Sequence, residues 1–92
     1  MSFIPIPIVS SLLDDEVLMN TENLVRMSNQ IGAFFESMPD REEALADIAN
    51  HLKRFWAPQM RHQLLDWAAR GEGAGLDEIV KEALSKYADT LR

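Results

Sequence analysis

The only two histidines of the chain each have a carboxylate four residues away, which is the spacing of neighbours on one face of a helix. The pairs are Asp47 with His51 and His62 with Asp66, and imidazole and carboxylate are both ligands of zinc. Each pair supplies only two ligands where zinc takes at least three, and Pro58 separates the pairs onto different helices. The chain also contains no cysteine. We therefore expect surface ion pairs here and no metal site.

Other polar side chains that could do chemistry lack the necessary spacing. The acidic residues of 14–16 and of 42–43 are adjacent in sequence, so on a helix they diverge rather than share one site. The serines have no strand-turn-helix context of the kind that exposes a nucleophile. The segment GEGAG, residues 71–75, lacks the spacing of a phosphate-binding loop and is expected to be a flexible connection. We expect no catalytic or cofactor-binding residue in this chain, and hence no enzyme.

The segment HLKRFWAPQMR, residues 51–61, lies in the only basic region of an acidic protein whose net charge is −6. Residues 50–70 hold four basic residues and one acidic residue, whereas residues 1–49 hold nine acidic residues and two basic ones. Cations beside aromatic rings can bind single-stranded nucleic acid, but the acidic remainder of the chain opposes that partner. A solvated helix end and a cationic surface for docking an acidic protein are the other two interpretations.

Four segments repeat apolar residues every three to four positions, as amphipathic helices do, and almost nothing alternates as a strand would. The first helix is expected over 21–38, with Asn20 or Thr21 as its cap. The second is expected to begin after Asp40, a good cap that is followed by Glu43 at the position of a capping box.

The third and fourth helices follow two further sequence signals. Pro58 suits the first turn of the third helix, because its missing N–H would have no partner there, and Asp77 is expected to cap the last helix. The fold class is therefore all-α, a small bundle of about four short helices. In chain order, the expected buried stripes are Leu24, Met27, Ile31, Phe34, Phe35 and Met38; Leu45, Ile48, Ala49, Leu52, Phe55 and Trp56; Met60, Leu64, Trp67 and Ala68; and Ile79, Val80, Ala83, Leu84, Tyr87 and Leu91.

Residues 1–18 differ in kind from the rest of the chain. They include FIPIPIV, whose alternating prolines favour an extended or polyproline conformation. This run is far shorter than the roughly 20 apolar residues of a membrane-spanning helix, and no basic residue precedes it as in a secretory signal. We expect an extended N-terminal arm over 1–18, a single helical domain over 19–92, no membrane contact and a cytoplasmic protein.

Three motifs connect the chain with a known family. LVRMSNQI lies in the first expected helix, MPDREEAL forms the turn into the second, and H-x-x-RFW-x-P-x-MR joins the second to the third. A looser match continues through LDEIVKEAL. Over residues 20–88 the sequence resembles the delta subunit of the soluble, NAD-dependent, molybdenum-containing formate dehydrogenases. Members of that family begin near Met19, which makes 1–18 either an arm or a start-site extension.

The resemblance implies a noncatalytic accessory subunit that stabilises or helps assemble an NAD-dependent formate dehydrogenase. Its partners would be the larger subunits, which carry the molybdopterin-molybdenum, iron-sulfur and FMN centres, and this chain would bind no cofactor itself. Two alternatives stay open: a transient assembly factor for loading the molybdenum cofactor, and an unrelated helical adaptor.

Combined with this resemblance, the basic segment leads to a hypothesis about partner binding. We expect Phe55 and Trp56 to point into the core and anchor the junction between the second and third helices, and Pro58 to set its angle. The cations of the segment are expected to form an edge that binds an acidic patch on a larger subunit. The predicted partner-binding residues are Lys53, Arg54, Phe55, Trp56, Pro58 and Arg61.

Overall fold

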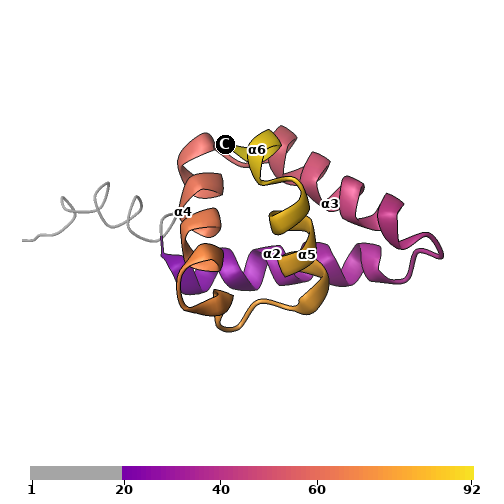
Figure 1. Ribbon diagram of the computed structural model, residues 1–92, viewed down its shortest axis with the longest axis horizontal. Coiled ribbons are helices and arrows are strands. Elements are labelled where there is room, and N and C mark those ends of the chain that lie inside the picture. The colour runs from indigo at the N-terminus through magenta and orange to yellow at the C-terminus, as the bar shows by residue number, and fades with distance from the viewer. Residues whose placement is uncertain (1–19) are drawn as a thin grey trace, which may run out of the picture.

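The computed structural model describes residues 20–92, apart from the side chain of Glu72, and the predicted arm over 1–18 lies outside these residues. Within them the all-α prediction is confirmed, because every regular element is a helix. The elements shown in Figure 1 are α2 (Thr21–Glu36), α3 (Arg41–Phe55), α4 (Pro58–Ala69), the 3-10 turn η1 (Gly71–Gly73), α5 (Glu78–Lys86) and α6 (Ala88–Leu91). In this part of the chain no helix is both long and apolar enough to cross a membrane.

The starts of the first three helices are where local sequence signals predict them. The side chain of Asn20 accepts a hydrogen bond from the Asn23 N–H at 3.1 Å, and that of Asp40 accepts from the Glu43 N–H at 3.2 Å. Pro58 is in the first turn of α4, as predicted. These caps satisfy backbone donors that have no partner inside the helix.

The C-terminal segment is two helices rather than the single helix that its apolar period predicts. Helix α5 ends at Lys86, and Tyr87 has φ −112° and ψ 24°, outside the helical region, before α6 begins at Ala88. The break lets α6 contact α3 and α4 as well as α5, and Leu91 is fully buried at its end. Tertiary packing of Leu91 therefore overrides the helical period at this point.

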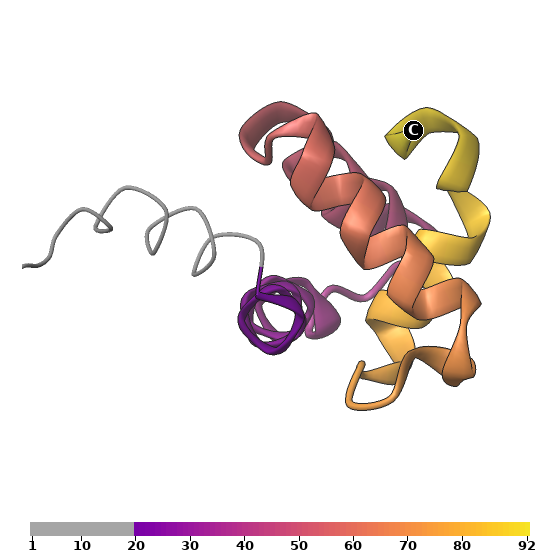
Figure 2. The ribbon, with the colours of Figure 1, turned by 90° about the vertical axis from the view of Figure 1, so that its left-hand side faces the viewer.

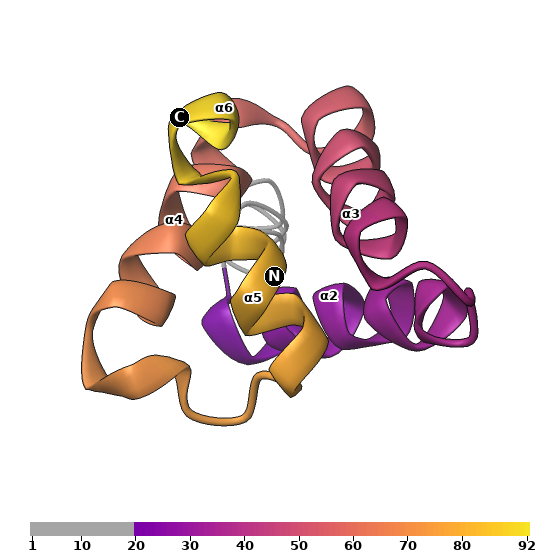
Figure 3. The same ribbon diagram turned by 45° about the vertical axis from the view of Figure 1, so that its right-hand side comes forward.

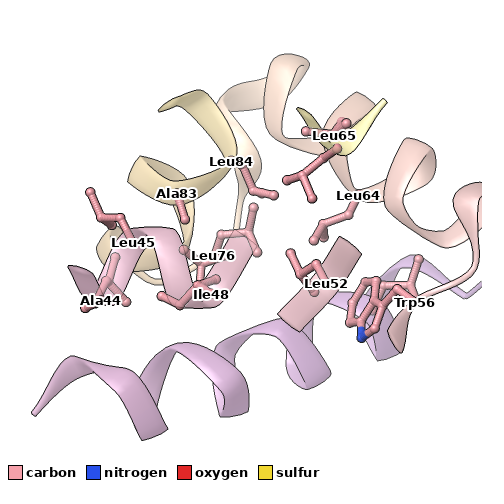
Figure 4. Packing of buried hydrophobic residues seen from close by; sticks show 14 residues of the cluster. Ala44, Leu45, Ile48, Leu52, Trp56, Leu64, Leu65, Leu76, Ala83 and Leu84 are labelled. Atoms are coloured by element: carbon pink, nitrogen blue, oxygen red, sulfur yellow. The ribbon is translucent and has the colours of Figure 1, made fainter. Parts of the chain in front are cut away.

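The hydrophobic core lies between α3, α4 and α5, with α2 packed across them. Figure 3 shows α3 and α4 on either side of α5, and Figure 2, where α2 is seen nearly end-on, shows α2 at one side of the other helices. Figure 4 shows Trp56 at one end of the buried cluster, beside Leu52 and Leu64. The largest fully buried apolar side chains are Leu24, Ile48, Leu52, Leu64, Ile79, Val80 and Leu91.

Helix α2 packs on the core through one large residue and two small ones. Its buried residues are Leu24, Ser28 and Gly32, and a Cβ atom at Gly32 would lie only 2.7 Å from Val80 Cγ2. The Ser28 hydroxyl donates to the carbonyl of Val25 at 2.9 Å, which satisfies it inside the protein. Of the predicted stripe, Leu24 is fully buried, Met27, Ile31, Phe35 and Met38 are partly buried against the core, and Phe34 is exposed.

The GEGAG segment is held by hydrogen bonds on both sides. The Trp67 indole donates to the carbonyl of Ala74, and the Asn29 side-chain amide donates to the carbonyl of Gly75, each at 2.9 Å. The Asn29 side-chain oxygen also accepts from the Asp77 N–H at 2.9 Å. Asp77 begins α5 as predicted, but its own side chain makes no cap hydrogen bond. The predicted flexible connection is thus pinned to α2 and α4.

Candidate docking surface

An apolar groove opens on the side of the molecule where α2 meets the end of α3. Its volume is about 460 Å³. The lining comes almost entirely from large apolar and aromatic side chains, which is the usual character of a binding site on a protein surface. The lining residues are Met27, Gln30, Ile31, Phe34 and Phe35 of α2 and His51 and Trp56 of the α3 end.

Two phenylalanines beside this groove are exposed. Phe34 is 75% exposed and Phe55 is 67% exposed, and both stand out among the large apolar residues of the described chain. The rings of Phe34 and Phe35 meet edge to face with their centroids 5.0 Å apart, and the His51 ring lies 4.8 Å from that of Phe55. An exposed aromatic cluster of this kind is a candidate interaction site.

A cation borders the aromatic cluster. The guanidinium carbon of Arg54 lies 5.6 Å from the centroid of the Phe55 ring, within the range of a cation–π contact. Both side chains are exposed, so this contact contributes little to stability. It does place one positive charge beside the apolar groove.

Phe55 was predicted to point into the core, and this prediction is wrong. Phe55 follows Ile48 by seven residues and so shares its side of α3, but it is the last residue of the helix. Trp56 leaves the helix with φ −95° and ψ 140° and is only 6% exposed, so its ring fills the core at this end. Phe55, by contrast, is left largely uncovered by the described chain and is 67% exposed.

Arg61 was predicted to be part of an exposed cationic edge, and the structure corrects this as well. It is only 7% exposed. Its guanidinium donates to the carbonyls of Trp56 at 2.8 Å, Leu91 at 3.0 Å and Lys53 at 3.3 Å. These oxygens lie at the C-terminal ends of α3 and α6, where carbonyls lack helical partners and the helix dipole favours a positive charge. Arg61 therefore caps the C-terminal ends of both α3 and α6.

Lys53 acts on the same corner of the molecule. Its side chain is exposed, but its ammonium donates to the carbonyl of Thr90 at 2.9 Å. Together with Arg61 it attaches the C-terminal turn of the protein to the end of α3. We call the group formed by Lys53, Arg61 and the carbonyls of Thr90 and Leu91 the C-terminal clasp.

The six predicted partner-binding residues thus divide into two groups. Trp56 and Arg61 are buried at the junction, whereas Lys53, Arg54, Phe55 and Pro58 are exposed. Of the six, only Trp56 lines the groove. That any of the six binds a partner stays a prediction.

The predicted ion pairs of the two histidines do not form. His51 lies against Phe55 and lines the groove, and His62 is exposed on α4. The ion pairs that do form, Arg41–Glu82 at 2.7 Å and Glu42–Lys86, join α3 to α5 at the other end of α3. Across residues 20–92, His, Asp and Glu side chains form no group of three that could hold a metal ion.

Sequence reasoning assigned the groove residues of α2 to the core alone; Met27, Ile31 and Phe35 do pack partly against it, but they also line the groove. One signal was present: the expected stripe on α2 holds six large apolar residues, more than a helix at the edge of so small a core can bury. Ser28 and Gly32 interrupt the set, and small residues mark the line along which another helix can approach closely. The groove residues missed in this way are Met27, Ile31, Phe34 and Phe35.

Comparison with known proteins identifies a family for the chain. Searches among curated proteins and among solved structures give no match. A family model described as "NADH-dependant formate dehydrogenase delta subunit FdsD" matches residues 23–84, which is more than half of the chain. The matched region includes most of α2, all of α3 and α4 and most of α5, and so contains both the groove and Arg61. The chain belongs to the FdsD family of formate dehydrogenase delta subunits.

Proposed function

We propose that this chain is a noncatalytic accessory subunit that stabilises or helps assemble an NAD-dependent formate dehydrogenase. We further propose that it binds a larger subunit through the groove between α2 and α3. The observation that carries the second proposal is the exposure of Phe34 and Phe55 beside an open aromatic groove. Aromatic residues that pack into a partner are typical anchors of protein interfaces.

Three of the originally predicted residues have a direct part in this proposal. Phe55 supplies apolar surface, Arg54 supplies a positive charge for an acidic residue of the partner, and Trp56 forms the floor of the groove. Pro58 sets the direction of α4 after the junction. Lys53 and Arg61 act indirectly, since the C-terminal clasp fixes the end of α3 on which the contact residues stand.

The iron-sulfur clusters of such an enzyme do not fit this chain. Iron-sulfur clusters are held by cysteine thiolates, and the sequence has no cysteine. The molybdopterin-molybdenum, iron-sulfur and FMN centres are proposed to reside in the larger subunits, and no step of formate oxidation is assigned to a residue here. By resemblance to the soluble enzymes, we propose that the complex is cytoplasmic.

Affinity purification of the tagged chain from cells that express the complete dehydrogenase tests this function. We expect the larger subunits to be recovered in a fixed ratio together with formate-dependent reduction of NAD. Recovery only with enzyme that lacks the molybdenum cofactor would instead identify a transient assembly factor. Recovery of the chain without any dehydrogenase subunit would contradict the proposal.

A further inference from the structure

The groove between α2 and α3 is well suited to an extended, proline-containing segment. Phe34, Phe35, His51 and Trp56 place four aromatic rings around one apolar channel. Proline-rich segments bind to aromatic-lined grooves because the polyproline conformation is already extended and loses little entropy on binding. The described helices do not fill this channel, which has a volume of about 460 Å³.

The same chain contains a segment of this composition. Residues 3–9 read FIPIPIV and combine two prolines with five large apolar residues. They lie outside the described residues, and outside the region 23–84 that the family model matches. A run this apolar is stabilised by burial, because removing its CH₂ groups from water is favourable.

The chain between the apolar run 3–9 and α2 is long enough for the run to reach the groove. The groove residues of α2 run from Met27 to Phe35, which is about 10 to 20 Å along the helix from Thr21 at a rise of about 1.5 Å per residue. Residues 10–19 link the apolar run to α2 and can span up to about 33 Å when extended. The run can therefore reach every part of the groove while attached to its own helix.

Charge also favours this occupant. Residues 1–19 contain Asp14, Asp15 and Glu16 and no basic side chain. Arg54 stands beside the aromatic cluster at the groove. Attraction between the segment and this side of the molecule adds to the apolar contact and weakens as salt is raised.

We propose that residues 3–9 of this chain bind in the α2–α3 groove of the same molecule when no partner is bound. The segment covers the apolar surface of the free subunit. A larger subunit that docks at the groove displaces it, which keeps the exposed aromatics from binding nonspecifically before assembly. The contact inside the free chain does not depend on the proposed function, because it requires no second protein.

Nuclear Overhauser spectroscopy on the isolated full-length chain, with isoleucine methyl groups labelled, tests the proposal. We expect short-range contacts from the methyls of Ile4, Ile6 or Ile8 to the ring protons of Phe34 or Trp56. Absence of all such contacts would overturn the proposal. So would contacts that appear only between differently labelled molecules in a mixed sample, since these would identify a second copy as the occupant.

A pair of matched variants separates apolar docking from charge and tether effects. The variant I4D/I6D should lose the contacts and shift the Trp56 indole signal. The control S2D/S10D adds the same two charges outside the apolar run and should keep both. Equal behaviour of the two variants would contradict docking of residues 3–9. Because no dehydrogenase is present, the result is independent of whether the chain binds that enzyme.

Discussion

The corner between α3 and α4 and the groove between α2 and α3 adjoin one another, yet a charged group is buried at the corner and aromatic rings are exposed at the groove. At the corner, the guanidinium of Arg61 is buried and donates to three carbonyls. At the groove, the rings of Phe34 and Phe55 are largely exposed. The hydrogen bonds of Arg61 explain why this cation is buried, whereas no residue of 20–92 covers the rings of Phe34 and Phe55. We therefore assign a structural role to the corner and propose the groove as the surface that binds a partner.

Replacement of Arg61 tests the structural half of this comparison and has the largest expected effect. Arg61→Met leaves the carbonyls of Lys53, Trp56 and Leu91 without their charged donor, so we expect a loss of about 2–4 kcal/mol in the free energy of unfolding. Urea denaturation followed by circular dichroism measures this loss. The matched change Arg54→Met removes an exposed guanidinium and should alter stability by less than about 0.5 kcal/mol.

A milder variant covers the case in which Arg61→Met does not fold. Arg61→Lys keeps the charge, but one ammonium cannot reach all three carbonyls. Its free energy of unfolding should therefore lie between those of wild type and Arg61→Met. Equal stability of the Arg61 and Arg54 variants would show that the buried hydrogen bonds contribute nothing and would remove the basis of the comparison.

Gly32 tests the claim that α2 approaches α5 closely at a small residue. Alanine usually stabilises a helix relative to glycine by about 1 kcal/mol, but here its Cβ would lie 2.7 Å from Val80 Cγ2 and 3.1 Å from Ile79 Cγ2. We expect Gly32→Ala to destabilise the protein by about 1–3 kcal/mol in urea denaturation.

The companion experiment repeats the substitution in a Val80→Ala background. Removing the two Val80 methyl groups relieves the clash, so Gly32→Ala should there be neutral or stabilising. If Gly32→Ala stabilised the wild-type protein, the close approach of α2 and α5 at Gly32 would be wrong.

Charge reversal at Arg54 tests the proposed role of the groove in binding a larger subunit. Arg54→Glu puts a negative charge beside the groove and should weaken binding to the larger subunits by up to about 1 kcal/mol, or about fivefold, at low salt. The difference should shrink as salt is raised, because exposed charges are screened. Binding measured by calorimetry at two salt concentrations checks this, and a salt-independent loss would point to misfolding instead.

The smallest effect is expected at the ion pair between α3 and α5. The hydrogen bond from Lys86 to Glu42, followed by the negative charge of Glu42, raises the pKa of Lys86 above its ordinary value of 10.5. The raised pKa means that the pair favours folding below the unfolded-state pKa of Lys86 and that this contribution is lost as pH rises through the folded-state pKa. The affected window is therefore strongly alkaline.

Glu42→Gln should lower the pKa of Lys86 toward its ordinary value, as an NMR titration of the lysine side chain would show. Because Lys86 is exposed, neutral-pH stability should barely change. An unchanged pKa in the variant would mean that Glu42 is not the partner of Lys86 in solution.

The predictable parts of this fold are those governed by nearby residues. Asn20 and Asp40 bind backbone N–H groups three residues ahead, and Pro58 acts within its own turn, so each signal is complete in the local sequence. The helix content follows from the apolar period in the same way.

The parts that sequence reasoning got wrong depend on distant neighbours. The carbonyl of Leu91 that receives Arg61 lies thirty residues further along the chain, and no local pattern reveals it. Helix α2 approaches α5 closely at Gly32, against Val80 and Ile79, and an apolar stripe read from α2 alone does not show that Phe34 stays exposed. Burial of Trp56 and exposure of Phe55 likewise depend on where α3 ends.

The most direct test of the division between corner and groove is the double variant F34S/F55S, measured for both stability and binding to purified larger subunits. Loss of two exposed aromatic contacts should weaken binding by about 2 kcal/mol or more, hence more than tenfold, while the free energy of unfolding changes less than it does in Arg61→Met. The control A33S/N50S changes exposed residues of the same helices and should bind like wild type. Wild-type affinity in F34S/F55S would contradict the account, because the groove would then not be the docking surface.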